Sequence, residues 1–512
     1  MFMFGKIDLN GKIDWTLTLV PFFGVAALAT IFMLVPEDSK RILEAIRKFI
    51  GDDCGIYYAI LGVGVFWLTV WTASSKYGKL RLGAESKPQY GDFLWGVMIF
   101  TSALAADIMF YSLSEWAMYA SDSYVQSKGE MQDWASTFPL FHWGPIAWCF
   151  HMMLAVCFGF MLHVRKRERQ RFSEACRPIF HEAVDGVCGR IIDILALLAM
   201  LAGIATTFSL ATPLLSAATS KVLGVPDGVG LTILILIVIA IIYTLTVWFG
   251  MKGISKMAQW CIYCFFAFLA YVLFLGGEIR YILETGFQSI GNLAQNFIGL
   301  STTMDPLRKT SFPQNWTLYY WAYWMAWTIG TPFFIGVISK GRTIRNTILG
   351  GYAWALAGTF TSFIILGNYG LAQQLKHGLD VVGIIETGGS YYDAILLILD
   401  TLPFPVIVLV LLVVTMVMFY ATSFDTLTLI ASTYSYKRIA PEEEPHKLIR
   451  TLWAVIFILF PVGLIFSENS MYGLQSVSII AAFPIGIIIL IVIRAFFKDA
   501  GEYIRETTHV SG

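Results

Sequence analysis

One aromatic segment, residues 312–327, has the side chains best suited to hold a ligand that offers no hydrogen bonds. A quaternary ammonium group is such a ligand, and each aromatic face attracts it by roughly 0.5–2 kcal/mol. Rings spaced at i, i+4, i+7 and i+11 share one face of a helix; in this segment they are Trp316, Tyr320, Tyr323 and Trp327. Trp324 follows Tyr323 directly and stands three positions before Trp327, so these three rings can converge on one cation.

The same rings also fit an interfacial aromatic belt or an ordinary packing core. Belts lie at the ends of membrane spans, whereas these rings continue toward the helix-breaking sequence Gly330-Thr331-Pro332. The residues alone leave the cation cage and the packing role open.

A second candidate is Asp107, which follows the mostly small residues 102–106 inside an apolar stretch. A carboxylate at membrane depth is costly, so it normally serves a ligand, an ion or a buried partner. A lone carboxylate attracts a substrate with net positive charge and repels the carboxylate of a zwitterion. Asp107 therefore favours a cationic substrate, with ion binding or internal hydrogen bonds as the alternatives.

The composition places both candidates in a lipid bilayer. Hydrophobic residues make up 57% of the 512 and charged residues 14%, with a mean hydropathy of +0.68. Ordinary soluble domains carry roughly 25% charged residues, so we predict an all-α polytopic membrane protein. Thirty-five basic residues balance 35 acidic ones, which argues against nucleic acid as a partner. The sequence contains no GxSxG, HExxH or Walker A motif and no cluster of His or Cys ligands, so no motif predicts an enzyme or a metal centre. A channel stays an alternative.

About twelve runs approach the roughly 20 apolar residues that a spanning helix needs. They are residues 15–35, 55–73, 93–120, 139–164, 191–216, 229–250, 258–277, 315–339, 346–370, 402–434, 449–467 and 474–497. Most loop Lys and Arg residues fall on the side of both termini, which predicts that both termini are cytoplasmic. We therefore expect a multi-pass protein of the inner (plasma) membrane.

The third and eighth runs contain helix-breaking sequences and lie five spans apart. Matching interruptions in two halves are typical of inverted-repeat transporters with a binding site at mid-membrane; close packing of small residues is the alternative. The expected division is a cytoplasmic tail (1–14), two helices outside the repeat (15–90), a first repeat (91–277), an extracellular connection with an amphipathic helix (278–314), a second repeat (315–497) and a cytoplasmic tail (498–512).

At these positions the chain resembles the betaine/choline/carnitine transporters. Residues 312–345, FPQNWTLYYWAYWMAWTIGTPFFIGVISKGRTIR, are similar to the family's eighth helix and following loop, and residues 141–145, FHWGP, to its fourth helix. The resemblance implies a LeuT-like fold of two five-helix inverted repeats after two extra helices, alternating access and a homotrimer. It implies a substrate cage of Trp143, Trp324 and Trp327, with Tyr323 where the family usually has Trp. Trp316 and Tyr320 would line the outer vestibule.

The resemblance also implies a coupling ion. Residues 419–423, FYATS, match the family's F-x-x-T-S sodium motif. The Thr422 and Ser423 hydroxyls and the Phe419 carbonyl would bind Na⁺, with the carbonyls of Thr101 and Leu104 opposite; such oxygens suit a hard cation. From the residues alone, these hydroxyls could simply join helices. A proton at Asp107 is the alternative coupling ion, and no other cofactor is expected.

The third helix distinguishes the substrates within the family. Betaine carriers have a glycine-rich GxGxG stretch where this chain has residues 103–107, ALAAD, and many choline carriers end this stretch in Asp. We therefore expect a secondary transporter, not an enzyme, that imports choline or a related quaternary ammonium solute. Carnitine, γ-butyrobetaine and glycine betaine, by import or exchange, are the alternatives.

Overall fold

The computed structural model describes residues 12–247, 250–440, 443–465 and 471–510. This part of the chain is helical almost throughout, and its β-contacts are two isolated bridges, Ile13–Tyr436 and Arg81–Thr343. Helices suit an apolar chain because they pair their backbone polar groups internally, where lipid offers no partners. The prediction of an all-α polytopic membrane protein is confirmed.

The α-helices follow one another along the chain in two halves. The first half has α1 (Trp15–Leu34), α2 (Pro36–Arg47), α3 (Gly55–Ser74), α4 (Asp92–Ala103), α5 (Asp107–Ala120), α6 (Ser123–Gln126), α7 (Met131–His142), α8 (Pro145–Gly159), α9 (Phe172–Ala175), α10 (Arg177–Phe180), α11 (Val187–Leu223), α12 (Val229–Val247) and α13 (Gly250–Leu275). The second half has α14 (Ile279–Thr302), α15 (Leu318–Ala326), α16 (Thr331–Ile338), α17 (Ile344–Ser362), α18 (Asn368–His377), α19 (Val381–Glu386), α20 (Tyr391–Asp400), α21 (Pro405–Tyr434), α22 (Lys447–Ile465) and α23 (Met471–Val510). Short π-helical turns occupy Lys48–Asp53, Phe160–Val164, Pro313–Thr317 and Phe363–Gly367.

Each of the twelve predicted runs overlaps a helix or a series of linked helices. Among the described residues, seven helices or linked helices are long and apolar enough to cross a membrane, and α4 with α5 adds an eighth if the bent pair is one span. The total of twelve spans stays a prediction. The predicted run 139–164 is not one straight helix, because α7 ends at His142 and α8 begins at Pro145. Pro145 disfavours helical geometry in the residue before it, Gly144. Trp143 and Gly144 therefore lie at the junction between α7 and α8.

Two further junctions occur where the sequence predicts interrupted helices. α4 and α5 meet at an angle of 69°, with Leu104 extended at φ −115° and ψ 124°. α15 and α16 are separated by a tight turn, Trp327–Ile329, and by Gly330. A Cβ atom at Gly330 would lie 2.3 Å from Leu427 Cδ2 of α21, so a larger residue here would require the Leu427 side chain to move.

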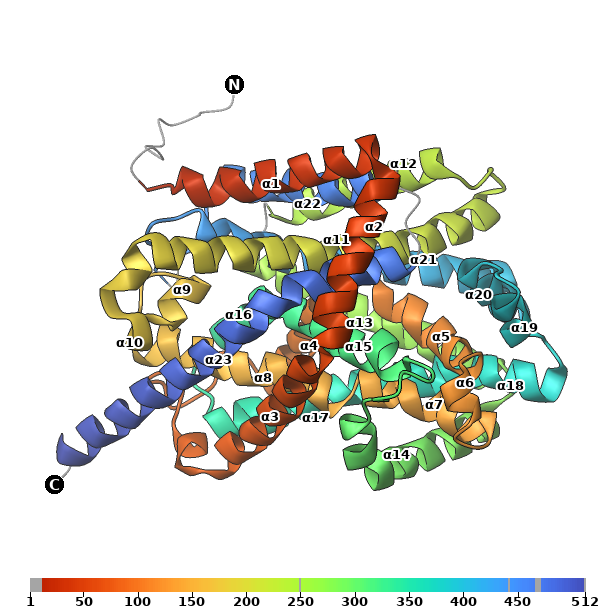
Figure 1. Ribbon diagram of the computed structural model, residues 1–512, viewed down its shortest axis with the longest axis horizontal. Helices are drawn as coiled ribbons and strands as arrows, with labels where there is room; N and C mark the ends of the chain where they lie inside the picture. The colour runs from red at the N-terminus through yellow and green to blue at the C-terminus, as the bar shows by residue number, and fades with distance from the viewer. Residues whose placement is uncertain (1–11, 248–249, 441–442, 466–470, 511–512) are drawn as a thin grey trace.

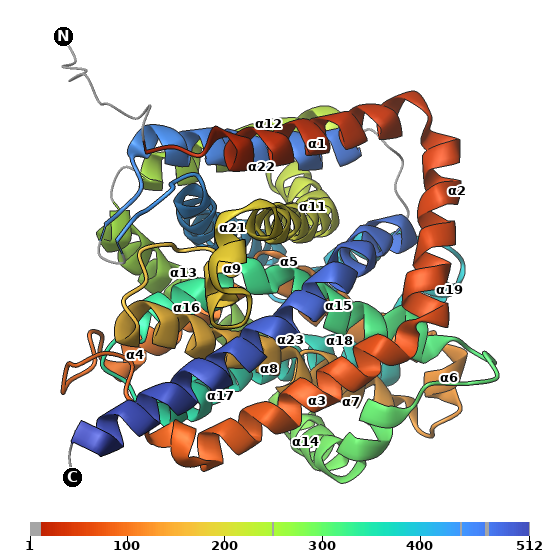
Figure 2. The ribbon, with the colours of Figure 1, turned by 60° about the vertical axis from the view of Figure 1, so that its left-hand side comes forward.

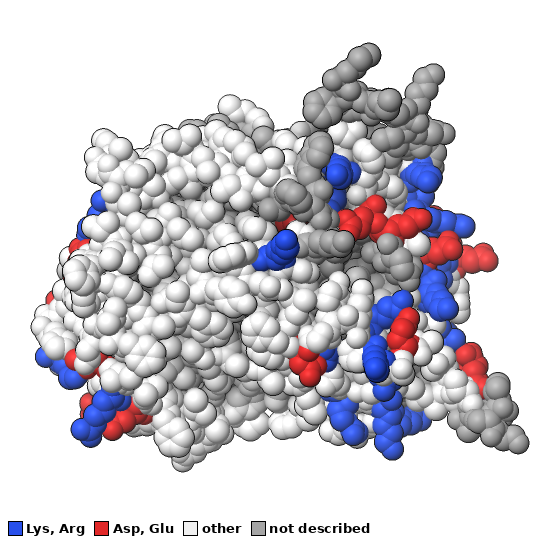
Figure 3. Space-filling view, turned by 180° about the vertical axis from the view of Figure 1, so that it is seen from behind, with Lys and Arg blue, Asp and Glu red and all other residues white. Residues whose placement is uncertain are grey.

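Figures 1 and 2 show how the helices surround these junctions. α1 runs beside α22, and α23 crosses the molecule diagonally over α15. α1 begins and α23 ends on the same side of the bundle, at the left of Figure 1. On the face seen in Figure 3, most charged side chains gather toward the two ends, and a largely uncharged band lies between them. This distribution suits a protein surrounded by lipid at its middle.

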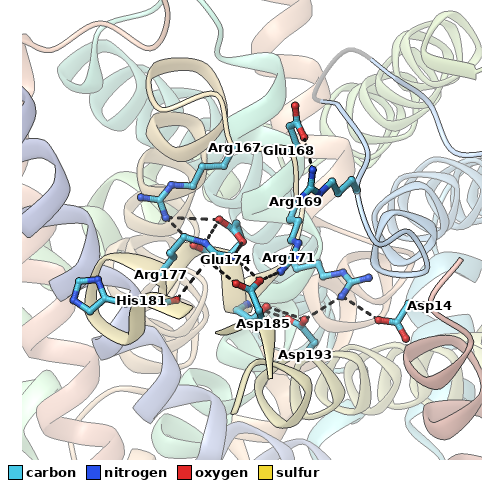
Figure 4. A network of polar contacts seen from close by, with 12 residues as sticks. Asp14, Arg167, Glu168, Arg169, Arg171, Glu174, Arg177, His181, Asp185 and Asp193 are labelled. Carbon is cyan, nitrogen blue, oxygen red and sulfur yellow. Dashed lines mark hydrogen bonds and ion pairs between the residues drawn. The ribbon is translucent and has the colours of Figure 1, made fainter. Parts of the chain in front are cut away.

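One charged loop ties several elements together at the end where α1 begins. Arg177 pairs with Glu174 at 2.6 Å and with Asp185 at 2.8 Å. The same loop contacts α23 through Asp499, which forms ion pairs with Arg165 at 2.7 Å and with Arg167 at 2.8 Å. Figure 4 shows the part of this network between residues 167 and 193, with Asp14 beside Arg171.

Candidate functional site

The predicted cage residues lie together in the interior, where α5, the α7–α8 junction and α15 meet. The exposed fractions are 1% for Trp143, 3% for Tyr323, 3% for Trp324 and 6% for Trp327. α15 holds two of these rings, Tyr323 and Trp324, among its nine apolar or aromatic residues, LYYWAYWMA, and Trp327 lies in the turn that follows. The described conformation therefore encloses the site away from bulk water.

The rings form two pairs. Trp324 meets Trp143 edge to face, with ring centroids 5.7 Å apart at 80°. Tyr323 meets Trp327 in the same manner, at 6.4 Å and 73°. The described structure contains no ring contact between the two pairs, and the convergence of Tyr323, Trp324 and Trp327 on one cation stays a prediction.

Each pair faces a different neighbour. Trp324 packs against Trp148 at 4.9 Å and His151 at 5.0 Å, both from α8. Trp327 lies against α11, where a Cβ atom at Gly203 would be 3.3 Å from its indole ring. The Nε1 donors of Trp324 and Trp327 are buried and have no acceptor in the described structure.

Asp107 joins the second pair at the first residue of α5. Its Oδ2 accepts a hydrogen bond from the Tyr323 hydroxyl and another from Thr207 Oγ1 at 3.4 Å. Thr207 and Tyr323 are themselves 2.5 Å apart, oxygen to oxygen. Asp107 is 3% exposed, and in the described part of the chain it forms no ion pair with Lys or Arg. A buried anion with only neutral donors suits a cationic ligand.

The predicted sodium ligands lie around the α4–α5 junction. Ser423 Oγ is 3.1 Å from the Thr101 carbonyl and 2.8 Å from the Leu104 carbonyl. Because Leu104 is extended, its carbonyl leaves the helical hydrogen-bond pattern. Thr422 Oγ1 instead contacts its own helix, at the carbonyls of Met418 and Phe419. These oxygens have the chemistry that Na⁺ prefers, and sodium binding stays a prediction.

The outer residues Trp316 and Tyr320 adjoin a polar chain that sequence reasoning did not assign. Tyr320 stacks on His142 at 5.0 Å, and Trp316 meets Tyr119 at 5.2 Å. The chain also contains Glu115, whose Oε2 accepts the Trp143 Nε1–H at 2.7 Å. Glu115 could have been found, because it is a second carboxylate inside the predicted span 93–120.

These observations define a polytopic helical membrane protein with a buried aromatic and acidic site at interrupted helices. The chain belongs to the family of betaine/carnitine/choline transporters, whose model matches residues 16–505. Members of this family are transporters and not enzymes, which confirms that prediction.

Several curated proteins are similar over most of their length. The glycine betaine transporter OpuD of Bacillus subtilis is 25% identical over 493 residues, 94% of each chain. The carnitine transporter of Acinetobacter baumannii is 26% identical over 490 residues, 95% of this chain and 88% of its own. The high-affinity choline transport protein of Escherichia coli is 25% identical over 507 residues, 96% of this chain and 73% of its own.

Proposed function

We propose that this protein is a secondary active transporter that imports a small quaternary ammonium solute, with choline as the favoured substrate. The observation that carries this proposal is the environment of Asp107. Among the described residues, the side-chain partners of this buried carboxylate are two neutral hydroxyl groups, and it lies beside aromatic rings. A cation that cannot donate hydrogen bonds would be attracted by the ring faces and by the nearby anion.

The unpartnered indole donors support a substrate with an oxygen at its other end. Trp324 Nε1 and Trp327 Nε1 are buried without acceptors, and buried donors are normally satisfied. The hydroxyl group of choline can accept one of them. A carboxylate can do so as well, which is why glycine betaine or carnitine, transported by relatives with those names, is the second candidate.

Coupling to Na⁺ is the proposed driving force, with Thr101, Leu104, Phe419, Thr422 and Ser423 as the ligands. The contacts of Ser423 with two carbonyl oxygens at the α4–α5 junction support it. The alternative is a proton carried by Asp107. Transport would follow alternating access in a LeuT-like, twelve-span homotrimer of the inner membrane with cytoplasmic termini. The matched helix breaks at α4–α5 and α15–α16 are typical of such folds.

Uptake into proteoliposomes tests the proposal. Labelled choline, glycine betaine and carnitine are offered separately, and an inward Na⁺ gradient and an inward proton gradient are imposed one at a time. We expect saturable choline uptake that depends on the Na⁺ gradient. A preference for a zwitterion would contradict the choline assignment, and full activity with a proton gradient alone would contradict the sodium assignment.

A further inference from the structure

The carboxylate of Glu115 lies behind the aromatic cage without being part of it. Glu115 stands on α5 and is 0% exposed, as is its neighbour His142. Its Oε2 accepts the indole N–H of Trp143 at 2.7 Å, which is a short N–H···O hydrogen bond. Trp143 in turn contacts the Trp324 ring edge to face, so Glu115 binds one of the cage rings from outside the cage.

The other oxygen of Glu115 begins a chain of hydrogen bonds across three elements. Oε1 contacts the Tyr119 hydroxyl, which lies 2.5 Å from His142 Nδ1. His142 Nε2 lies 2.9 Å from Thr317 Oγ1 in the turn before α15. The chain thus links α5, the end of α7 and the segment that carries the cage aromatics.

Two opposite proton arrangements fit this chain, and one of them leaves Glu115 ionised. Trp143 Nε1 can only donate, so Oε2 must accept. If Thr317 donates to His142 Nε2, then His142 Nδ1–H donates to Tyr119 and Tyr119 donates to Oε1. Every proton then points toward Glu115, and both of its oxygens accept, which is the arrangement that stabilises an ionised carboxylate.

An anion at this position acts on the cage in two ways. The hydrogen bond sets the orientation of the Trp143 indole, which lies at the junction just after the last residue of α7. The negative charge of Glu115, which lies beside Trp143 Nε1, would also strengthen the attraction of the site for a cation. It would act directly on the cation and through polarisation of the indole π face. Only the second effect requires the ligand to be charged.

We propose that Glu115 is a positioning residue for the substrate cage, and that its negative charge selects a cation through Trp143. This inference rests on the proposed function, because it requires Trp143 to contact the quaternary ammonium group. In the described part of the chain, Glu115 accepts hydrogen bonds from Trp143 and Tyr119, so we expect it to act on the substrate through the indole ring.

Charge and geometry can be separated with two variants and two probes. The probes are choline and its uncharged analogue, in which a quaternary carbon replaces the nitrogen. Glu115→Gln keeps an acceptor for Trp143 but removes the charge, so choline affinity should fall about tenfold while affinity for the neutral analogue is unchanged. Glu115→Asp keeps the charge but withdraws it from the indole, so affinity for both probes should fall by similar factors.

A matched control removes a hydrogen-bond acceptor from an indole outside the cage. Trp95 Nε1 donates to Ser339 Oγ at 3.0 Å in a buried site, and Ser339→Ala should leave the ratio of the two affinities unchanged. The readout is equilibrium binding to purified protein, with size-exclusion profiles to verify folding. If Glu115→Gln does not fold, Glu115→Asp still decides the positioning role.

Each outcome bears on a different claim. Equal losses for both probes in Glu115→Gln would overturn the charge effect, and unchanged affinities in both Glu115 variants would overturn the positioning role. A wild-type protein that binds no quaternary ammonium compound would instead refute the proposed function, and the role of Glu115 would fall with it.

Discussion

Acidic side chains in the centre of this molecule and at the end where α1 begins have opposite surroundings. In the centre, Asp107 and Glu115 accept hydrogen bonds from hydroxyl and indole groups. In the charged loop, Asp185 is bound by arginine side chains, and the loop's Arg165 and Arg167 bind Asp499 of α23 (Figure 4 shows Asp185). The arginines beside Asp185, Arg177 first, hold the pKa of this exposed carboxyl below its usual range.

This difference separates structure from function. A carboxylate already paired with arginine is neutralised by the fold and contributes to holding segments together. A buried carboxylate without a cationic partner is unfavourable, and binding of a cation relieves that cost. The buried carboxylates of the centre therefore suit a positively charged ligand, whereas those of the charged loop already have cationic partners.

The largest expected effect tests whether the central aromatic rings bind the ligand. Trp324→Ala or Trp327→Ala should weaken choline binding by up to about 30-fold, since each removes a ring face and its cation–π attraction of up to about 2 kcal/mol. Trp→Phe at the same positions should retain part of the affinity. Isothermal titration on purified protein gives the values. Unchanged binding in both Ala variants would show that these rings only pack the core.

The second prediction concerns the charge of Asp107. Asp107→Gly should lower choline affinity about tenfold or more, while glycine betaine or carnitine binding holds or improves, because repulsion of their carboxylate is removed. Asp107→Asn is the matched variant, since it can keep the contact with Tyr323. Competition binding against all three ligands is the measurement. A wild type that prefers a zwitterion would contradict the prediction and leave the aromatic cage in place.

The third prediction asks whether the neutral oxygens of the centre bind a coupling ion. Thr422→Ala combined with Ser423→Ala should reduce Na⁺ stimulation of uptake several-fold or more without unfolding the protein, because hydroxyl ligands are lost. Ser432→Ala on the same helix is the control, as its hydroxyl contacts its own helix at the Thr428 carbonyl. Persistent stimulation in the double variant would place Na⁺ elsewhere.

The smallest effect on binding is expected from the charged loop. Asp499→Asn removes a partner of Arg165 and Arg167, whose side chains are 20% and 17% exposed. The loss should destabilise the protein by about 1–3 kcal/mol, which lies between the usual cost of breaking an exposed ion pair and that of breaking a buried one. Choline affinity should stay unchanged. Thermal unfolding in detergent measures the first effect. A large loss of affinity would show that the loop is coupled to the site and would end the distinction between the two regions.

The sequence alone predicted much of this arrangement. The apolar runs predicted a helical membrane protein because lipid excludes unpaired backbone groups. The small residues before Asp107 and the Gly330-Thr331-Pro332 sequence predicted interruptions that the structure contains. The break at Gly330-Thr331-Pro332 is local, since glycine and proline change the backbone wherever they stand.

Other features required the tertiary structure. The division of the cage into two ring pairs depends on which neighbouring helix each ring of α15 meets, and periodicity contains no such information. The contact of Ser423 with Thr101 and Leu104 joins residues more than 300 positions apart.

The clearest case is the chain from Glu115 to Thr317. In sequence, His142 resembles an ordinary packing residue and Glu115 is one acidic residue in an apolar helix. Their hydrogen bonds exist only because α5, the end of α7 and the turn before α15 pack together. The sequence thus determined the helices, their breaks and the residue types of the site. Tertiary packing decided which polar groups became partners, because a hydrogen bond depends on distance and direction in space and not on separation along the chain.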